Sequence, residues 1–144
     1  LGTDEDRDYL NIQLEKNINA NPKMPDTDSD GLRDDVEYTT GTLASIRDTD
    51  SDGLIDGFED ANLNGKQDRG ETNPRNKDSD NDHMCDGLCR IKFNKQEYFI
   101  GEDRNLNGKV DDGETNPLNR DSDGDESPDD IEFYQCLKDG GTDC

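Results

Sequence analysis

The chain has very little from which to build a hydrophobic core. Of its 144 residues only 26% are hydrophobic and 6% aromatic, and there is no tryptophan. In contrast, 38% of the residues are charged and the net charge is −22. Such a chain cannot bury enough apolar surface to offset its conformational entropy, so composition alone predicts disorder. A fold therefore requires a contribution from outside the side-chain core, for which metal ions and disulfides are the known devices.

Other scarce features exclude whole classes of function. Only 16 basic residues stand against 38 acidic ones, which excludes nucleic-acid binding through phosphate contacts. No apolar run approaches the length of a membrane span. The single histidine, His83, has no Ser-His-Asp or Cys-His set around it, so we expect no enzymatic activity. The chain begins at Leu1 and shows no signal peptide, which we interpret as a processed product or an excised piece.

What the chain does have is a recurring twelve-residue pattern. It reads DTDSDGLRDDVE at 26–37 and returns at 48–59, 60–71, 78–89, 103–114 and 121–132, with a weaker echo at 4–15. Oxygen-bearing side chains fall at positions 1, 3, 5, 9 and 12, and glycine usually falls at position 6. A longer repeat, shifted by 43 residues, aligns 59–82 with 102–125. Repetition on this scale makes a chance match to a ligand motif a poor explanation.

This spacing is that of the EF-hand type of calcium loop. Carboxylates this close repel one another, and a cation between them removes the repulsion. Calcium takes six to eight oxygens at about 2.3–2.6 Å, whereas magnesium prefers octahedral sites that keep several waters. Position 7 offers its backbone carbonyl, so its side chain is unrestricted. The sequence therefore predicts about six calcium ions, which would neutralise more than half of the net charge.

The predicted ligands share positions 1, 3, 5, 7, 9 and 12 of their loops. They are Asp26, Asp28, Asp30, Leu32, Asp34 and Glu37; Asp48, Asp50, Asp52, Leu54, Asp56 and Glu59; Asp60, Asn62, Asn64, Lys66, Asp68 and Glu71; Asp78, Asp80, Asp82, Met84 and Asp86; Asp103, Asn105, Asn107, Lys109, Asp111 and Glu114; and Asp121, Asp123, Asp125, Ser127, Asp129 and Glu132.

Three loops depart from the pattern. The loop at 78 has His83 at position 6 and Cys89 at position 12, so it lacks the bidentate glutamate. The loop at 121 has Glu126 in place of glycine. The echo at 4–15 has Tyr9 at position 6 and Ile12 at position 9, and it is the weakest candidate.

The expected fold is irregular, with little regular secondary structure: an elongated, calcium-cored repeat array with a few short helices and one small β-hairpin. No helix fits between Glu59 and Asp60, which end and begin consecutive loops, so these are not paired EF-hands. Short helices are expected at about 5–19, 34–40 and 129–138, and a hairpin around Asn94-Lys95. We expect one array over 1–144, with a helical segment at 1–25, loops at 26–89, an insertion at 90–102, loops at 103–132 and a C-terminal segment at 133–144.

The stretches DTDSDGLRDDVEYTTGT at 26–42 and DTDSDGLIDGFED at 48–60 resemble the thrombospondin type 3 repeat, especially its bacterial form. GETNP at 70–74 and 113–117 resembles the connector of that family. The resemblance covers most of 26–132. It implies a backbone that wraps a row of calcium ions, with ligands carried over to Asp26, Asp28, Asp30, Asp34 and Glu37 and to the equivalent positions of each later loop.

The four cysteines, Cys85, Cys89, Cys136 and Cys144, allow three pairings. Their spacings fit neither the usual zinc pair nor haem attachment, and in a small, core-poor chain they favour disulfides and an oxidising compartment. Because the two groups are far apart in an elongated chain, we predict the local pairs Cys85–Cys89 and Cys136–Cys144. Cys89 would then not be a ligand, and the site at 78 would have to borrow an oxygen from elsewhere.

We therefore expect an extracellular or cell-surface calcium-binding structural protein, a rigid spacer or fibre subunit. The alternative is a dockerin-like or adhesive module whose docking to a protein partner depends on calcium, although dockerins follow each loop with a long helix. A calcium sensor is disfavoured by the presence of only two methionines. A soft-metal site at His83-Met84-Cys85 is also disfavoured, because three adjacent residues do not easily face one ion. Phe93, Tyr98, Phe99 and Ile100 are expected to form a contact surface for a protein partner or for self-assembly.

Overall fold

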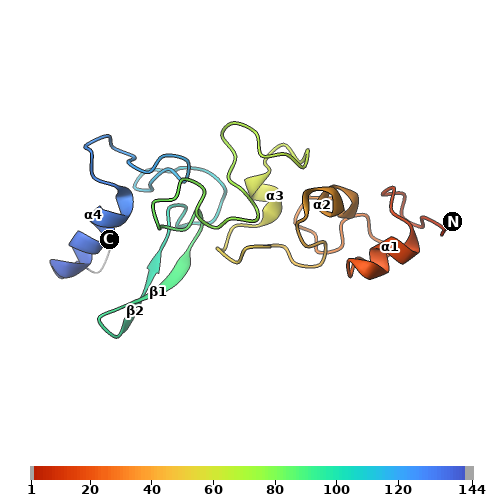
Figure 1. Cartoon of the computed structure of the whole chain (residues 1–144), viewed down its shortest axis with the longest axis horizontal. Coiled ribbons are helices and arrows are strands. Elements are labelled where there is room, and N and C mark those ends of the chain that lie inside the picture. The colour runs from red at the N-terminus through yellow and green to blue at the C-terminus, as the bar shows by residue number, and fades with distance from the viewer. Residues whose placement is uncertain (1, 142–144) are drawn as a thin grey trace. The chain divides into compact units, whose positions relative to one another are not determined.

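The computed structural model of the chain describes residues 2–141 (Figure 1). It is 19% helical and 9% strand, which confirms the prediction of an irregular fold with little regular secondary structure. Its contacts divide it into two compact units. Unit 1 comprises Leu1–Asp50 and Ile55–Arg75, and unit 2 comprises Ser51–Leu54 and Asn76–Cys144. Each unit is described by itself.

Unit 1 contains three short helices: α1 (Ile12–Asn17), α2 (Asp34–Thr40) and α3 (Asp56–Glu59). Helix α2 has the predicted bounds and ends at Gly41, whose φ of 84° is left-handed. The helix predicted over 5–19 is wrong in its first half. Arg7 and Tyr9 have φ of 68° and 76°, which no α-helix contains. The helix begins only after Asn11, whose side chain accepts hydrogen bonds from two backbone N–H groups of the first turn.

The interior of unit 1 is built largely from carboxylates. Its buried apolar side chains are two leucines and two alanines: Leu10, Ala20, Leu32 and Ala44. Fully buried beside them are the acidic side chains Asp8, Glu15, Asp34, Glu37 and Asp56. Acidic residues are among the least often buried unless paired. This reversal of the usual core composition is the first structural indication of a cation.

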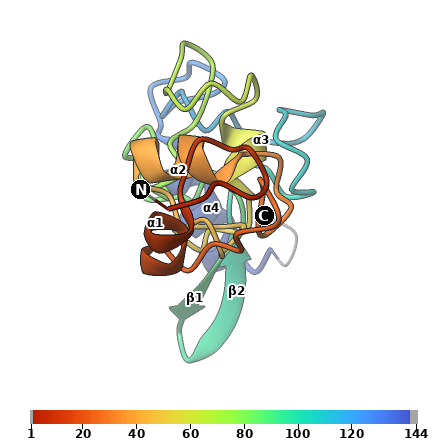
Figure 2. The same cartoon turned by 90° about the vertical axis from the view of Figure 1, so that its right-hand side faces the viewer.

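Unit 2 contains the hairpin of β1 (Cys89–Phe93) and β2 (Gln96–Ile100), followed by helix α4 (Asp129–Lys138). The strands are antiparallel, and Cys89 pairs with Ile100. Asn94 and Lys95 form the turn with φ of 49° and 70°, values typical of a two-residue hairpin loop. The predicted hairpin and the predicted helix at 129–138 are both confirmed. The ribbon of the hairpin extends away from the loops in both views (Figures 1 and 2).

The expectation that the hairpin offers a broad exposed apolar surface is wrong for most of its residues. Ile100 is 1% exposed, and Phe93 and Tyr98 are half-buried. The ring of Phe93 lies 5.8 Å from that of Tyr134 on α4. Only Phe99 is largely exposed, at 57%. Alternation along the paired strands places Phe93, Tyr98 and Ile100 on one face of the hairpin and Phe99 on the other.

The predicted disulfide between Cys85 and Cys89 is present. The predicted pair of Cys136 with Cys144 involves a residue outside those that the structure describes. Within residues 2–141, no helix combines the length and the apolarity that crossing a membrane requires.

Candidate metal centres

Seven loops of the chain share one backbone conformation. Positions 4 and 6 have left-handed φ in every loop. At position 4 these residues are Arg7, Ser29, Ser51, Leu63, Asn81, Leu106 and Gly124, and at position 6 they are Tyr9, Gly31, Gly53, Gly65, His83, Gly108 and Glu126. Left-handed φ is unfavourable for residues with a Cβ, yet Tyr9, His83 and Glu126 adopt the conformation that glycine adopts elsewhere. The three loops whose sequences departed from the pattern therefore keep its geometry.

The first and fifth side chains of a loop hold this conformation through backbone hydrogen bonds. In the loop at 26, Asp26 accepts from the N–H groups of Ser29 and Gly31 at 2.7 and 3.2 Å. Asp30 accepts from the N–H of Leu32 at 2.8 Å. These bonds fix the side-chain rotamers and bring the carboxylates at positions 1, 3 and 5 together. The same hydrogen bonds therefore shape both the turn and the carboxylate cluster of the folded loop.

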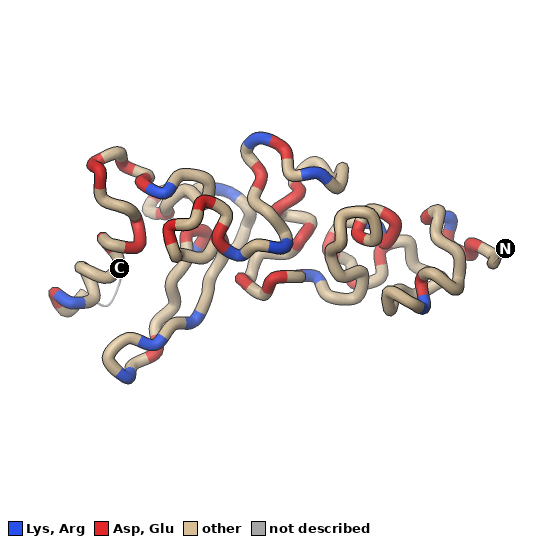
Figure 3. The backbone as a smooth tube through the Cα atoms, in the orientation of Figure 1, with Lys and Arg blue, Asp and Glu red and all other residues tan. Residues whose placement is uncertain are grey.

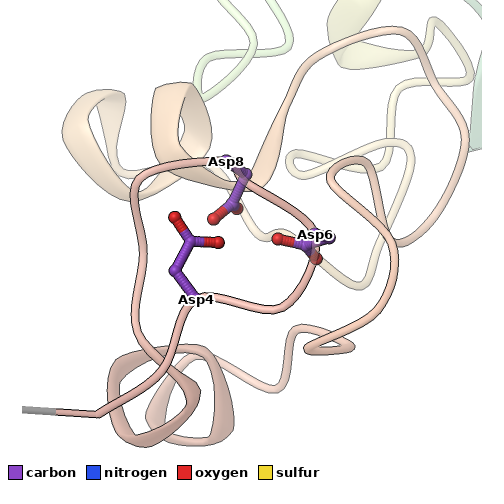
Figure 4. Close-up of side chains that lie close together, drawn as sticks. All are labelled: Asp4, Asp6 and Asp8. Carbon is purple, nitrogen blue, oxygen red and sulfur yellow. The ribbon is translucent and has the colours of Figure 1, made fainter.

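The weak echo at 4–15 has the same construction. Asp4 accepts from the N–H groups of Arg7 and Tyr9, and Asp8 accepts from that of Leu10. Figure 4 shows the carboxylates of Asp4, Asp6 and Asp8 directed toward one another inside the loop. The sequence analysis ranked this loop lowest because of Tyr9 at position 6 and Ile12 at position 9, yet its acids at positions 1, 3 and 5 are arranged as in the other loops.

Neighbouring loops of unit 1 share carboxylates. Asp34, at position 9 of the loop at 26, has oxygens within 4.8 Å of those of Asp8 and Glu15 in the preceding loop. In the same way Asp56 joins Asp30 and Glu37. The sequence prediction assigned position 9 to its own loop alone. The structure shows that this residue also lies beside positions 5 and 12 of the loop before it.

The shared aspartates are held by the residue at position 2. The hydroxyl of Thr27 donates to one oxygen of Asp34 at 2.7 Å, and its N–H donates to the other at 2.8 Å. Thr49 binds Asp56 in the same manner. In unit 2, Ser79 binds Asp86, and Ser122 binds Asp129. In each case the two hydrogen bonds fix the orientation of the aspartate at position 9.

Several buried carboxylates have no partner that would stabilise their charge. Glu37 is fully buried, and neither of its oxygens accepts a hydrogen bond from any described residue. Burial, together with the charges of Asp28 and Asp30, raises its pKa to about 9. Glu15 is equally buried and unpartnered, and burial and the nearby Asp6 raise its pKa to about 7. Orphaned buried carboxylates of this kind are the donor set that a hard cation fits.

The two asparagine-containing loops are satisfied differently. In the loop at 60, the amide of Asn62 donates to Glu71 at 2.7 Å and that of Asn64 donates to Asp68 at 2.7 Å. The amides of Asn64 and Asn62 lower the pKa of Asp68, and the loop at 103 repeats this arrangement around Asp111. An NH₂ group cannot ligate a cation, so these loops would need their amides rotated to present oxygen. They are weaker candidates than the all-acid loops.

The loops at 78 and 121 lie in unit 2. Asp78 accepts from the N–H of His83, which takes the place of glycine, and the imidazole of His83 contacts Asp130 at 3.3 Å. Asp121 accepts from the N–H of Glu126 in the other loop. Glu132 lies on the exposed side of α4, and partial desolvation followed by the charges of Asp123 and Asp125 raises its pKa.

The other predicted ligands belong to the loop at 48 and to position 7 of each loop. The boundary between the units runs through the loop at 48, which places Asp48, Asp50, Asp56 and Glu59 in unit 1 and Asp52 and Leu54 in unit 2. The side chains at position 7 are buried for Leu32, Leu54 and Met84, half-buried for Ser127 and exposed for Lys66 and Lys109. This mixture agrees with a position that would contribute its backbone carbonyl. Acidic residues recur in loop after loop of both units (Figure 3).

Fold and site together define an acidic repeat protein whose clustered carboxylates could bind metal ions. Comparison of the chain with protein-family models, with curated proteins and with solved structures finds no match. The resemblance to the thrombospondin type 3 repeat therefore stays a prediction from the motifs.

Proposed function

We propose that this chain is an extracellular calcium-binding structural protein whose loops are closed by calcium ions. The observation that carries the proposal is the environment of Glu37. Its carboxylate is fully buried, has no hydrogen-bond partner among the described residues, and lies within 4.8 Å of Asp30 and Asp56. Leaving an ionised carboxylate buried and unpaired costs several kcal/mol, and a divalent cation removes that cost for all three groups together.

Calcium is favoured over other cations by the chemistry of the donors. The clusters consist of carboxylate oxygens, which suit a hard cation that accepts a high and flexible coordination number. Soft metals require thiolate or imidazole ligands. Cys85 and Cys89 are joined in a disulfide, and the imidazole of His83 is largely exposed. We propose that the all-acid loops bind most tightly and that the loop at 4 belongs with them.

A structural role is supported by the sharing of carboxylates between consecutive loops. In unit 1, Asp34 and Asp56 each belong to one loop and contact the acids of the preceding one. An ion held in this way would bridge two loops and restrain the segment between them, residues 16–25 or 38–47. The Cys85–Cys89 disulfide supports an oxidising, extracellular location. The helices at the ends of the loops have 6, 7, 4 and 10 residues (α1, α2, α3 and α4), and the loops at 60, 78 and 103 are followed by no helix among the described residues, which disfavours the dockerin-like alternative.

The test is a calcium titration of the chelator-treated chain. Isothermal calorimetry and elemental analysis should show at least five bound ions, with magnesium as the control cation. Small-angle scattering should show that the metal-free chain expands and that calcium compacts it, because binding supplies most of the free energy of folding. Two or fewer bound ions, or an unchanged radius of gyration on chelation, would refute the proposal.

A further inference from the structure

Glu102 lies outside every twelve-residue loop, yet it is as deeply buried as the predicted ligands. It is fully buried, and neither carboxylate oxygen accepts a hydrogen bond from any described residue. Burial, followed by the charges of Asp80, Asp82 and Asp86 in the loop at 78, raises the pKa of its carboxyl to about 9. The loop at 78 is the loop whose own position 12 is Cys89, which the disulfide with Cys85 removes as a ligand.

The hairpin explains how a residue thirteen positions beyond Cys89 reaches this loop. Because β1 and β2 are antiparallel and Cys89 pairs with Ile100, the chain returns to the point from which it departed. The N–H of Glu102 then donates to the carbonyl of Cys85 at 3.0 Å, and that of Asp103 donates to the carbonyl of Asp86 at 2.9 Å. Gly101 lies so close to the carbonyl of Gly87 that a Cβ would collide with it. These contacts fix Glu102 against the loop at 78.

Most carboxylate oxygens of Asp80, Asp82 and Glu102 accept no hydrogen bond from the described residues. Asp80 and Asp82 each use one oxygen to accept a backbone N–H, at 3.1 and 2.7 Å. Their other oxygens, like both oxygens of Glu102, have no hydrogen-bond partner within the described part of the chain. The hydroxyl of Thr115 is near the Glu102 carboxylate, but it makes no hydrogen bond of its own. Asp80, Asp82 and Glu102 thus have four carboxylate oxygens without a hydrogen bond among the described residues.

We propose that Glu102 is the missing twelfth-position ligand of the loop at 78, supplying its oxygens to a calcium ion held by Asp80 and Asp82. This inference rests on the proposed calcium-binding function. The hairpin is then an insertion within a calcium loop, placed between position 11 and the residue that acts as position 12. The sequence carries a signal for it, because the 43-residue repeat aligns Glu102 with Glu59, the twelfth residue of the loop at 48.

A competing explanation is that Glu102 is simply protonated and contributes only to packing. The variant Glu102→Gln distinguishes packing from calcium binding. Glutamine has the shape of a protonated glutamate, but its uncharged amide oxygen is a weaker metal ligand than a carboxylate. The matched control is Glu97→Gln, which changes an exposed glutamate of the same hairpin that pairs with Arg90 and Lys92. A second control is Glu37→Gln in unit 1.

The experiment is calcium titration of the four full-length chains by calorimetry, with stoichiometry checked by elemental analysis. We expect Glu102→Gln to lose one ion, or to bind it with an affinity weakened on the order of tenfold or more, while Glu97→Gln matches the unmodified chain. If Glu102→Gln also matches it while Glu37→Gln loses an ion, the Glu102 assignment is wrong and the proposed function stands. If the unmodified chain binds no calcium, both are wrong.

A second measurement uses the unmodified chain and remains informative if the variant does not fold. The side-chain carboxyl resonance of Glu102, followed by NMR, should move at the same addition of calcium as that of Asp80. A Glu102 resonance that stays in place while Asp80 shifts would overturn the proposal.

Discussion

The backbone N–H of Gly87 donates a 2.8 Å hydrogen bond to the carboxylate of Asp52, 35 positions earlier in the chain. The N–H of Leu88 donates to the carbonyl oxygen of the same aspartate at 2.5 Å. Gly87, at position 10 of the loop at 78, therefore packs directly against Asp52, at position 5 of the loop at 48, within unit 2. In unit 1, Gly57 and Asp30 stand in the same relationship, since a Cβ at Gly57 would collide with the carbonyl of Asp30.

Gly87→Ala should destabilise unit 2 strongly, by about 3 kcal/mol. A Cβ at this position would lie 2.7 Å from the carbonyl oxygen of Asp52, and backbone atoms cannot move aside as a flexible side chain can. Gly124→Ala is the control, because it adds the same methyl group with nothing within 4 Å and should lose only about 1 kcal/mol through its left-handed φ. Urea unfolding in calcium measures both; equal losses would contradict the close contact.

Glu126→Gly should stabilise the chain by about 1 kcal/mol. Glu126 has φ of 77°, which glycine adopts without strain, and its N–H bond to Asp121 is kept in the variant. The reciprocal change, Gly31→Ala at φ of 109°, should destabilise by a similar amount or more. Unfolding midpoints in saturating calcium provide the comparison. A destabilised Glu126→Gly chain would show that this side chain has a role beyond the turn.

Phe93→Ser should destabilise unit 2 by about 2 kcal/mol, because its ring packs against Tyr134. Phe99→Ser should change stability by at most about 1 kcal/mol, since this ring is mostly exposed and contacts the Arg90 guanidinium at 5.5 Å. Denaturant unfolding followed by tyrosine fluorescence reports on both. Equal effects would show that the two faces of the hairpin are not distinct.

The expansion of the metal-free chain should depend on pH, because its folded state should lose stability as the pH rises from about 4.5 to about 9. Burial raises the pKa of Glu37 in the folded state to about 9, against an ordinary value of 4.5. The folded state therefore holds this proton more tightly, and its stabilising effect is complete below pH 4.5 and lost as the pH rises through 9. Urea midpoints in chelator at several pH values test this, and Glu37→Gln should flatten the dependence. A metal-free midpoint that increases with pH would contradict it.

Calcium should reverse that dependence. Protons compete with calcium for the same carboxylates, so calcium affinity should rise with pH over the same range. Calorimetry at pH 5 and pH 8 should show weaker binding and less complete occupancy at the lower value. Affinity independent of pH would mean that the ions are not bound by Glu37, Asp30 and their equivalents, whose pKa values burial raises.

The sequence by itself determined the loops, because their geometry is local. Alternating acids followed by a turn produce the same backbone whichever loop contains them, and even Tyr9 and His83 adopt the left-handed conformation that the pattern requires. The hairpin around Asn94-Lys95 and the helices α2 and α4 were equally predictable, since turn residues and short-range pattern specify them.

Tertiary structure alone decided which carboxylates meet. The pairing of Asp34 with Glu15 and of Asp56 with Glu37 joins residues about twenty positions apart, and no periodicity within a loop specifies it. The hairpin returns the backbone of Glu102 to Cys85 in the loop at 78, and the same hairpin turns Phe93 toward Tyr134 rather than toward solvent. These relationships depend on how loops stack on one another, which follows from close contacts at residues such as Gly57, Gly87 and Gly101 and not from the propensity of any single segment.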